Sequence, residues 1–170
     1  MKIIIKYTLA LTAVLLGKDF LVYNYLWKTG SALINILPYF LIIGLFIYTG
    51  IYELKKKKYD GEISYKDASL NGLAIMLCTA IVYSLMFYFV FPFGNPAFKE
   101  EFLARALEVL QNNPSFPKED IPSTMQKYKH NLQPFVMAQS EFITILIFGT
   151  ITSLLSASIQ RKKIDIPPSS

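Results

Sequence analysis

The chain has 170 residues, of which 53% are hydrophobic and 17% are charged, and its formal net charge is +5. An ordinary soluble domain carries about 25% charged residues, so this composition argues against one. The positive charge does not indicate nucleic-acid binding either, because the lysines gather at the ends of apolar segments, where they orient membrane helices and meet anionic headgroups. We therefore expect membrane lipids as partners and no nucleic acid.

Four apolar stretches are each long enough to cross a bilayer. A hydrocarbon core of about 30 Å requires roughly 20 helical residues. The first stretch also has the outline of a secretory signal peptide, but no pair of small residues precedes a cleavage point, so we expect an uncleaved helix. Pro38 is expected in the first turn of the second helix. The predicted spans are residues 6–27, 34–54, 69–91 and 137–159.

A dense cluster of lysines separates the second span from the third. Lys55, Lys56, Lys57 and Lys58 follow one another between two apolar runs, and the positive-inside rule predicts that this loop is cytoplasmic. Alternation then places both termini in the cytoplasm. The same lysines are candidates for contact with lipid headgroups or a phosphorylated ligand, although topology alone explains them. Gly61 is expected to support the turn of the loop.

Residues 97–133 form the one sizeable segment outside the predicted spans, and we expect an outer helical cap there. Apolar residues recur every three or four positions, which predicts an amphipathic helix that ends at Asn112 and Asn113. A second short helix is predicted after Asp120, with Pro122 in its first turn. Both helices are expected either to lie flat on the outer leaflet or to roof the bundle. The apolar face of the first helix is a candidate surface for a partner or for the membrane, and its members are Phe98, Phe102, Leu107 and Leu110.

These elements predict the fold class and the domain organisation. Residues 1–163 are expected to form a single four-span membrane domain, and residues 164–170 a disordered tail. The fold class is all-α, an integral membrane four-helix bundle with an extracytoplasmic amphipathic helical segment between helices three and four.

Two stretches carry a family resemblance. After the lysines come a glycine, an aromatic residue followed by lysine, a small residue and a second glycine, which are Gly61, Tyr65, Lys66, Ala68 and Gly72. Residues 125–134 lead into a final helix that is rich in glycine, threonine and serine and ends in Arg-Lys-Lys. Together they resemble a bacterial inner-membrane family catalogued as a domain of unknown function, number forty-one ninety-nine. The resemblance implies a four-helix protein of the bacterial cytoplasmic membrane and no established activity.

Apart from Lys6 and Glu53 at the ends of their spans, three charged residues lie within the predicted spans. Lys18 and Asp19 are adjacent in the first span, and Glu141 lies near the start of the fourth, at a similar depth. A charge at the bilayer centre costs about 2.5–3.5 kcal/mol on insertion scales, so such groups pair, face the bundle interior or reach the surface. We expect a structural contact between Lys18 and Glu141 that joins the first and fourth helices. The alternative is a proton or ion relay.

Small residues recur four apart on the last span, at Gly149, Ser153 and Ala157. Small side chains at this spacing allow two helix backbones to approach closely. Packing within the chain is the favoured use, and homodimerisation is the alternative.

No combination of residues indicates catalysis, a cofactor or a metal site. His130 is the only histidine and has no cysteine near it in the sequence, and the carboxylates of the cap accompany no nucleophile or base. The sequence favours a non-enzymatic accessory or scaffold protein that binds another membrane protein, a lipid or a second copy of itself. The alternative is a small transporter or channel subunit that uses Lys18, Asp19 and Glu141.

Overall fold

The computed structural model describes residues 1–23, 32–94 and 97–161, with the side chains of 32–37 and 92–94 left out. Within these ranges the expected all-α class is confirmed, because they contain six α-helices, one short 3-10 helix and no strand. The end of the first expected span, residues 24–27, and the expected tail, residues 164–170, lie outside the description. The elements are α1 (Lys2–Leu21), α2 (Ala32–Lys58), α3 (Tyr65–Gly94), α4 (Phe98–Asn112), η3 (Lys118–Asp120), α5 (Ile121–Asn131) and α6 (Pro134–Gln160).

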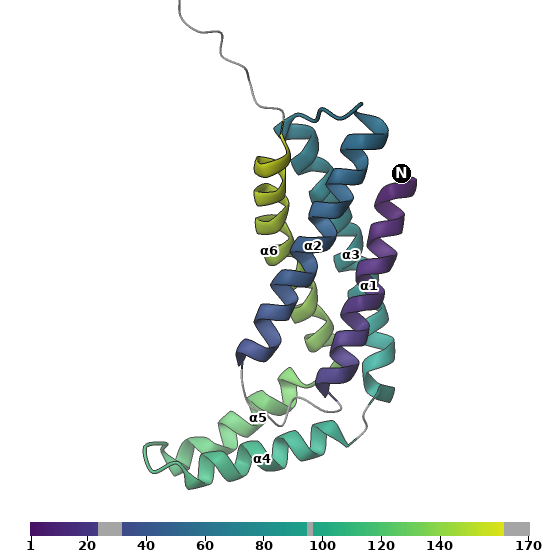
Figure 1. The fold of residues 1–170 in the computed structure, drawn as a ribbon. Helices are drawn as coiled ribbons and strands as arrows, with labels where there is room; N and C mark the ends of the chain where they lie inside the picture. Colours follow the sequence, from purple (N-terminus) through teal and green to yellow (C-terminus); the bar gives the residue numbers. More distant parts are fainter. Residues whose placement is uncertain (24–31, 95–96, 162–170) are drawn as a thin grey trace, which may run out of the picture.

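Four long helices, α1, α2, α3 and α6, run side by side as a bundle, and α4 and α5 lie across one end of it (Figure 1). The contact between α3 and α6 is the most extensive in the bundle, while α1 packs mainly on α3 and α2 mainly on α6. The N-terminus, the turn between α2 and α3 and the last turn of α6 lie together at the end away from α4 and α5. We call this the lysine end, and we call residues 97–133 the cap.

A single hydrophobic core runs along the bundle. On α2 the core residues recur every four positions, at Tyr39, Ile43, Ile47 and Ile51, and all of them are buried. A four-residue spacing keeps side chains on one face of a helix, so this row points at the other three helices. Tyr83 of α3 is fully buried in the same core.

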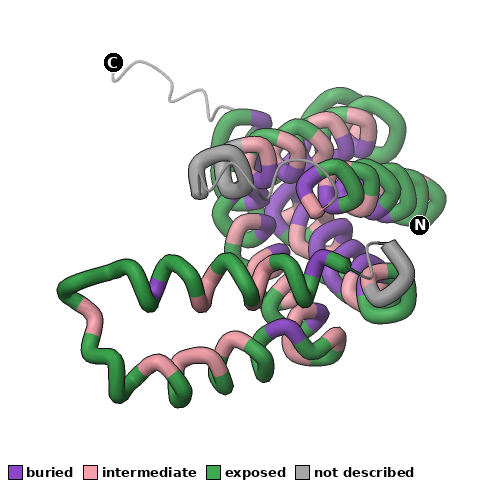
Figure 2. The backbone as a smooth tube through the Cα atoms, turned by 90° about the horizontal axis from the view of Figure 1, so that it is seen from below, coloured by how far each residue is buried: buried purple, intermediate pink, exposed green. Residues whose placement is uncertain are grey.

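The outward faces of the four long helices are apolar as well. Leu9 of α1, Leu45 of α2, Leu85 of α3 and Ile147 of α6 are each more than half exposed. Among the described residues, every large hydrophobic side chain that is exposed belongs to these helices or to Met1, with the sole exception of Val109 in the cap. Exposed positions follow the outside of the bundle in Figure 2. A bundle in water keeps such faces polar, so this surface suits an apolar surrounding.

Two of the helices are long and apolar enough to cross a membrane. In the described part of the chain these are Tyr65–Phe91, with a mean hydropathy of 2.2, and Pro134–Gln160, with a mean hydropathy of 2.0; each has 27 residues. They are α3 and α6, the pair that makes the main contact of the bundle.

The lysine cluster belongs to a helix, which corrects the expectation of a loop there. Lys55 and the three lysines after it form the last turn of α2, because the partial negative charge at a helix C-terminus favours basic side chains. The chain then reverses at Asp60, with φ 49°, and at Gly61, with φ 88°. The Gly61 N–H donates to the Lys55 carbonyl oxygen at 2.9 Å. The expected role of Gly61 in the turn is confirmed.

Pro38 also differs from its expected place. The helix α2 begins at Ala32, so Pro38 lies inside it and not in its first turn. Proline lacks an N–H and leaves one carbonyl of the preceding turn without its helical hydrogen bond. Such a proline is tolerated in apolar helices that pack against neighbours, which explains why α2 extends on both sides of it.

The cap follows the predicted pattern closely. The helix α4 ends at Asn112, and α5 begins at Ile121 with a proline in its first turn, so both predictions are confirmed. The two helices form a hairpin that reaches sideways beyond the bundle (Figure 2). An edge-to-face aromatic contact anchors the hairpin where α4 begins, because the centroid of the Phe98 ring lies 5.0 Å from that of the Tyr23 ring.

The small residues of α6 lie where this helix approaches α3. Gly149, Ser153 and Ala157 are all buried. A Cβ atom added at Gly149 would overlap the Met76 side chain of α3, and one added at Gly72 of α3 would lie 2.9 Å from the Ser153 Oγ atom. Glycine thus allows each helix to come close to the other.

We expect Gly149→Ala to lower the melting temperature of the purified protein in detergent, because the added methyl group forces Met76 to move within a close-packed contact. Overpacking of this kind costs roughly 1–3 kcal/mol. Gly17→Ala is the matched control, since nothing lies within 4 Å of a Cβ atom at Gly17. Equal melting temperatures for the two variants would contradict the tight contact between α3 and α6.

Candidate functional site

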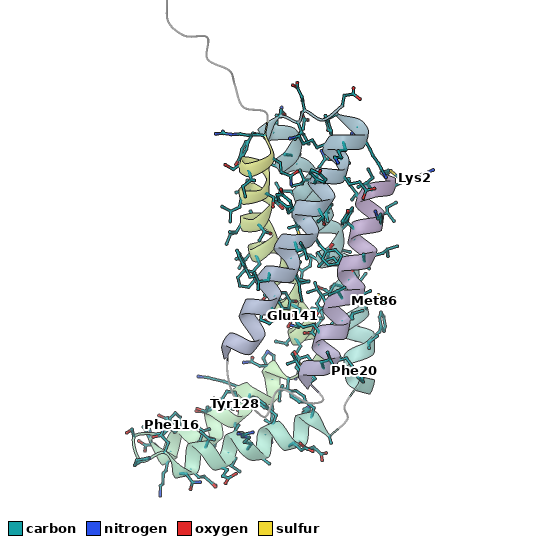
Figure 3. All side chains as sticks on the ribbon, viewed as in Figure 1. Lys2, Phe20, Met86, Phe116, Tyr128 and Glu141 are labelled. Atoms are coloured by element: carbon teal, nitrogen blue, oxygen red, sulfur yellow. The ribbon has the colours of Figure 1, made fainter. Side chains whose placement is uncertain are left out.

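A cavity of about 340 Å³ lies where α1, α2 and α6 meet the beginning of α4. Glu141 of α6 lies inside the bundle at this level, near the cap (Figure 3). The lining combines charged groups with aromatic rings. It consists of Lys18, Asp19, Val22, Tyr23, Tyr39, Phe98, Phe102, Glu141, Thr144 and Phe148.

The buried face of α1 positions the first carboxylate. Leu11, Leu15 and Asp19 recur every four residues, so Asp19 continues a row of core side chains, and only 4% of it is exposed. Its Oδ1 atom lies 2.6 Å from the Lys18 Nζ atom. The other oxygen, Oδ2, is buried and has no hydrogen-bond partner. A buried carboxylate oxygen without a donor is costly, because it has lost the water that would solvate it.

Tyr39 of α2 connects the remaining charges. Its hydroxyl group donates a hydrogen bond of 2.6 Å to the Glu141 Oε2 atom. The Lys18 ammonium group lies 3.9 Å from the centroid of the Tyr39 ring, where the face of the ring attracts a cation. Asp19, Lys18, Tyr39 and Glu141 therefore form a continuous chain of contacts that joins α1, α2 and α6. We call these four residues the charge chain.

The structure brings Lys18, Asp19 and Glu141 to one cavity but arranges them differently from the expected direct contact between Lys18 and Glu141. Lys18 is ion-paired with its neighbour Asp19, and Glu141 accepts its hydrogen bond from Tyr39. The long lysine side chain can reach both the adjacent carboxylate and the tyrosine ring. Lys18 and Tyr39 together thus link the two carboxylates, whereas the sequence suggested that Lys18 alone would join them.

Tyr39 is the residue that sequence reasoning missed. It shares a four-residue spacing with Ile43, Ile47 and Ile51, and the whole row is buried. A tyrosine at an inward position in an apolar helix is a usable signal, because its buried hydroxyl group requires a hydrogen-bond partner. That signal indicates a polar acceptor on a facing helix, and Glu141 is this acceptor.

The apolar face of α4 has partners within the chain, which agrees with a cap that roofs the bundle and not with one that lies open on the outer leaflet. Phe98 is buried and Phe102 is half-buried, and both line the cavity. The Phe102 ring also meets the Tyr128 ring of α5, with 6.2 Å between centroids. Leu107 is half-buried and Leu110 is buried. The neighbouring helix and the end of the bundle supply the nearest apolar surfaces, and they cover most of this face.

At the lysine end, basic side chains make contacts within the chain. The Lys55 Nζ atom donates to the Gln160 carbonyl oxygen at 3.0 Å. Glu53 accepts from both Lys6 and Lys57, each at 2.7 Å. These contacts tie α1, α2 and α6 together at the end away from the cap. Contact between Lys55–Lys58 and lipid headgroups stays a prediction.

Other parts of the described chain hold fewer polar or charged groups that could bind a ligand. A groove of about 760 Å³ between α3 and α6 is lined mainly by apolar side chains, with Ser84 and Gln139 as its polar members. Among the described residues, no three side chains of histidine, cysteine, aspartate or glutamate lie close enough together to hold a metal ion. The charge chain and its cavity are therefore the candidate functional site.

Lys18→Met is expected to reduce the abundance of the protein in membranes and its melting temperature, because Asp19 would remain buried without its counter-ion. Removing one partner of a buried ion pair costs about 3–5 kcal/mol. The double variant Lys18→Met with Asp19→Asn should recover part of the loss.

Lys57→Met is the matched control for this experiment. It also removes a lysine that is paired at 2.7 Å, but the side chain of Lys57 is 65% exposed, and exposed pairs contribute little to stability. If Lys18→Met is as abundant and as stable as Lys57→Met, the charge chain is not a structural link.

Comparison with known proteins identifies the family of the chain. The model of the family described as Protein of unknown function (DUF4199) matches residues 3–162. Searches among curated proteins and among solved structures each found no match. The family match covers nearly the whole chain, including all six α-helices and the cavity beneath the cap. The chain belongs to the DUF4199 family.

Proposed function

We propose that the chain is a multi-pass protein of the bacterial inner membrane in which α1, α2, α3 and α6 are four spans. The observation that supports this is the apolar outward face of each of these helices, which continues from α3 and α6 onto α1 and α2. The cap, by contrast, exposes a single large hydrophobic side chain among its described residues. An apolar surface that surrounds the bundle and stops at the cap suits a bilayer around the bundle and water around the cap.

The orientation follows from the basic residues. Lys2, Lys6, Arg161 and the cluster Lys55–Lys58 gather at the lysine end, whereas the cap carries five basic and five acidic residues. Short segments rich in lysine and arginine stay in the cytoplasm. Both termini are cytoplasmic in this proposal, and the cap lies on the outer side.

Labelling of single cysteines tests this topology. In a Cys78→Ala background, a membrane-impermeant maleimide should label Glu108→Cys in the cap of intact spheroplasts. The same reagent should label Glu62→Cys, in the turn after α2, only once the membrane is permeabilised. Labelling of both positions in intact spheroplasts would contradict a membrane between the two ends, and the reversed pattern would invert the orientation.

For the activity, we infer a non-enzymatic accessory or scaffold role in which the cap binds another membrane protein. The observation that carries this inference is the hairpin of α4 and α5, which is anchored at its base and extends beyond the bundle (Figures 1 and 2). Away from the bundle, α4 has a hollow of about 540 Å³ with Val109 in its lining. Val109 is 61% exposed and lies beside Arg105, Glu108 and Asn112.

The chemistry of this hollow favours a protein over a lipid surface. Helices that lie on membranes carry a strongly basic polar face opposite bulky apolar side chains. Here the apolar face of α4 packs against α5 and the bundle, and the exposed side mixes Glu108 with Arg105 around one valine. An apolar contact with a polar rim is typical of a protein interface.

A photocrosslinking residue at Val109 is expected to form one discrete adduct with another membrane protein in living cells. The charge reversal Glu108→Lys should remove that adduct while the protein remains at normal abundance. The same photocrosslinking residue at Leu85, on the outward face of α3, serves as the control and should react with lipid. Adducts at Val109 with lipid alone would overturn the protein-binding role, and adducts with a second copy of the chain would indicate a homo-oligomer.

A second candidate function is a small transporter or channel subunit. The observation that favours it is the gathering of Lys18, Asp19 and Glu141 around one cavity at the cap end. Charged groups inside membrane bundles often mark the path of an ion or substrate. The two candidates depend on different surfaces: the scaffold role on the outside of the cap, and the transport role on the cavity beneath it.

A further inference from the structure

We propose that the cavity beneath the cap binds a small organic ammonium ion, that is, a positively charged amine with apolar substituents. This site lies at the N-terminal end of α4, at Phe98 and Phe102, whereas the hollow around Val109 lies in the C-terminal half of the same helix, and the two share no lining residue. The proposal is therefore independent of the scaffold role, and either can fail without the other.

The charges of the cavity favour a cation. Two carboxylates, Asp19 and Glu141, face a single ammonium group, that of Lys18, among the described lining residues. Lys18 is already engaged with the Asp19 Oδ1 atom at 2.6 Å. With both carboxylates ionised, the lining keeps a negative charge that a bound cation would neutralise.

The second carboxylate oxygen of Asp19 is an independent indication of a ligand. Asp19 is 4% exposed and lines the cavity, yet its Oδ2 atom accepts no hydrogen bond. Buried polar atoms in folded proteins nearly always have a partner, and of the seven buried side-chain atoms that lack one among the described residues, this is the one whose residue lines the cavity. The Oδ2 atom itself is closed to solvent, so an amine in the cavity would stabilise the carboxylate through its positive charge, or donate to Oδ2 once the side chain turns toward the cavity.

The aromatic walls indicate what kind of cation fits. Rings from Tyr23, Tyr39, Phe98, Phe102 and Phe148 line the cavity. Ring faces attract cations, and aromatic cages recognise alkylammonium groups in this way. The Lys18 ammonium group, 3.9 Å from the Tyr39 centroid, is an example of this contact inside the cavity itself. A bare metal ion prefers a shell of oxygen ligands, which these rings do not provide.

Size and position agree with a small ligand. A volume of about 340 Å³ lies at the lower end of the range for small-molecule sites, roughly 300–1,000 Å³. The cavity lies at the cap end of the bundle, where α4 covers it with two phenylalanine side chains. The cavity therefore lies near one end of the bundle and not midway along its apolar core.

Choline and its neutral isostere 3,3-dimethyl-1-butanol test the proposal, because they share a shape and differ in charge. We expect choline to bind the purified full chain in detergent by calorimetry, and the neutral compound to bind at least about tenfold more weakly, or 1.4 kcal/mol. If neither choline nor tetramethylammonium binds at roughly 10 mM, a weak-affinity limit, the proposal is overturned. Equal binding of choline and its isostere would also overturn it.

Variants locate the site. Asp19→Asn and Phe102→Leu should each weaken choline binding about tenfold or more, the first through charge and the second through loss of a ring. Phe102 is half-buried, so Phe102→Leu serves as the test if Asp19→Asn fails to fold. Glu100→Gln is the matched control, because it removes an exposed carboxylate of α4 that does not line the cavity and should leave binding unchanged. Binding that none of these variants alters would place the ligand elsewhere and refute the assignment.

Discussion

The close approach of α3 and α6 is the constraint on which the rest of the structure depends. Gly72 on one helix and Gly149 on the other leave room for the Ser153 and Met76 side chains of the opposite helix. The helix α1 then packs mainly on α3, and α2 mainly on α6. Since α1 has no extensive contact with α6, its position relative to α6 depends on additional interactions. The charge chain supplies these at the cap end, and the contacts of Lys55 and Glu53 supply them at the other.

A polar link inside an apolar bundle stabilises only if each member has a partner, because every unpaired group keeps its full desolvation cost. Tyr39 satisfies Glu141, and Lys18 satisfies one oxygen of Asp19. Among the described residues the second oxygen stays without a partner, on a side chain that lines the cavity beneath the cap. The same residues therefore join three helices and leave one carboxylate of the cavity incompletely satisfied, so a structural role and a binding role are compatible at this site.

The cap shows how one correct pattern leaves two interpretations open. The period of its apolar residues predicted an amphipathic helix, and α4 is one. The pattern does not say what covers the apolar face, because amphipathicity is a property of one helix alone. In the structure, α5 and the end of the bundle cover most of that face, and the large hydrophobic side chain that the cap exposes is Val109, in the C-terminal half of α4. The candidate surface for a partner is therefore the one around Val109 and not the row of apolar residues that begins at Phe98.

By itself, the sequence determined the all-α class, the approximate helices, the turn at Gly61, the two helices of the cap and the family. All of these depend on spacing, composition and turn residues within short stretches of chain. Only the tertiary structure decided that Tyr39 lies between Lys18 and Glu141, that Asp19 keeps one oxygen without a partner and that α4 covers the cavity. These facts depend on how helices distant in the sequence rotate and pack against one another, and the periodicity of a single helix carries no information on which residue of another helix it will meet.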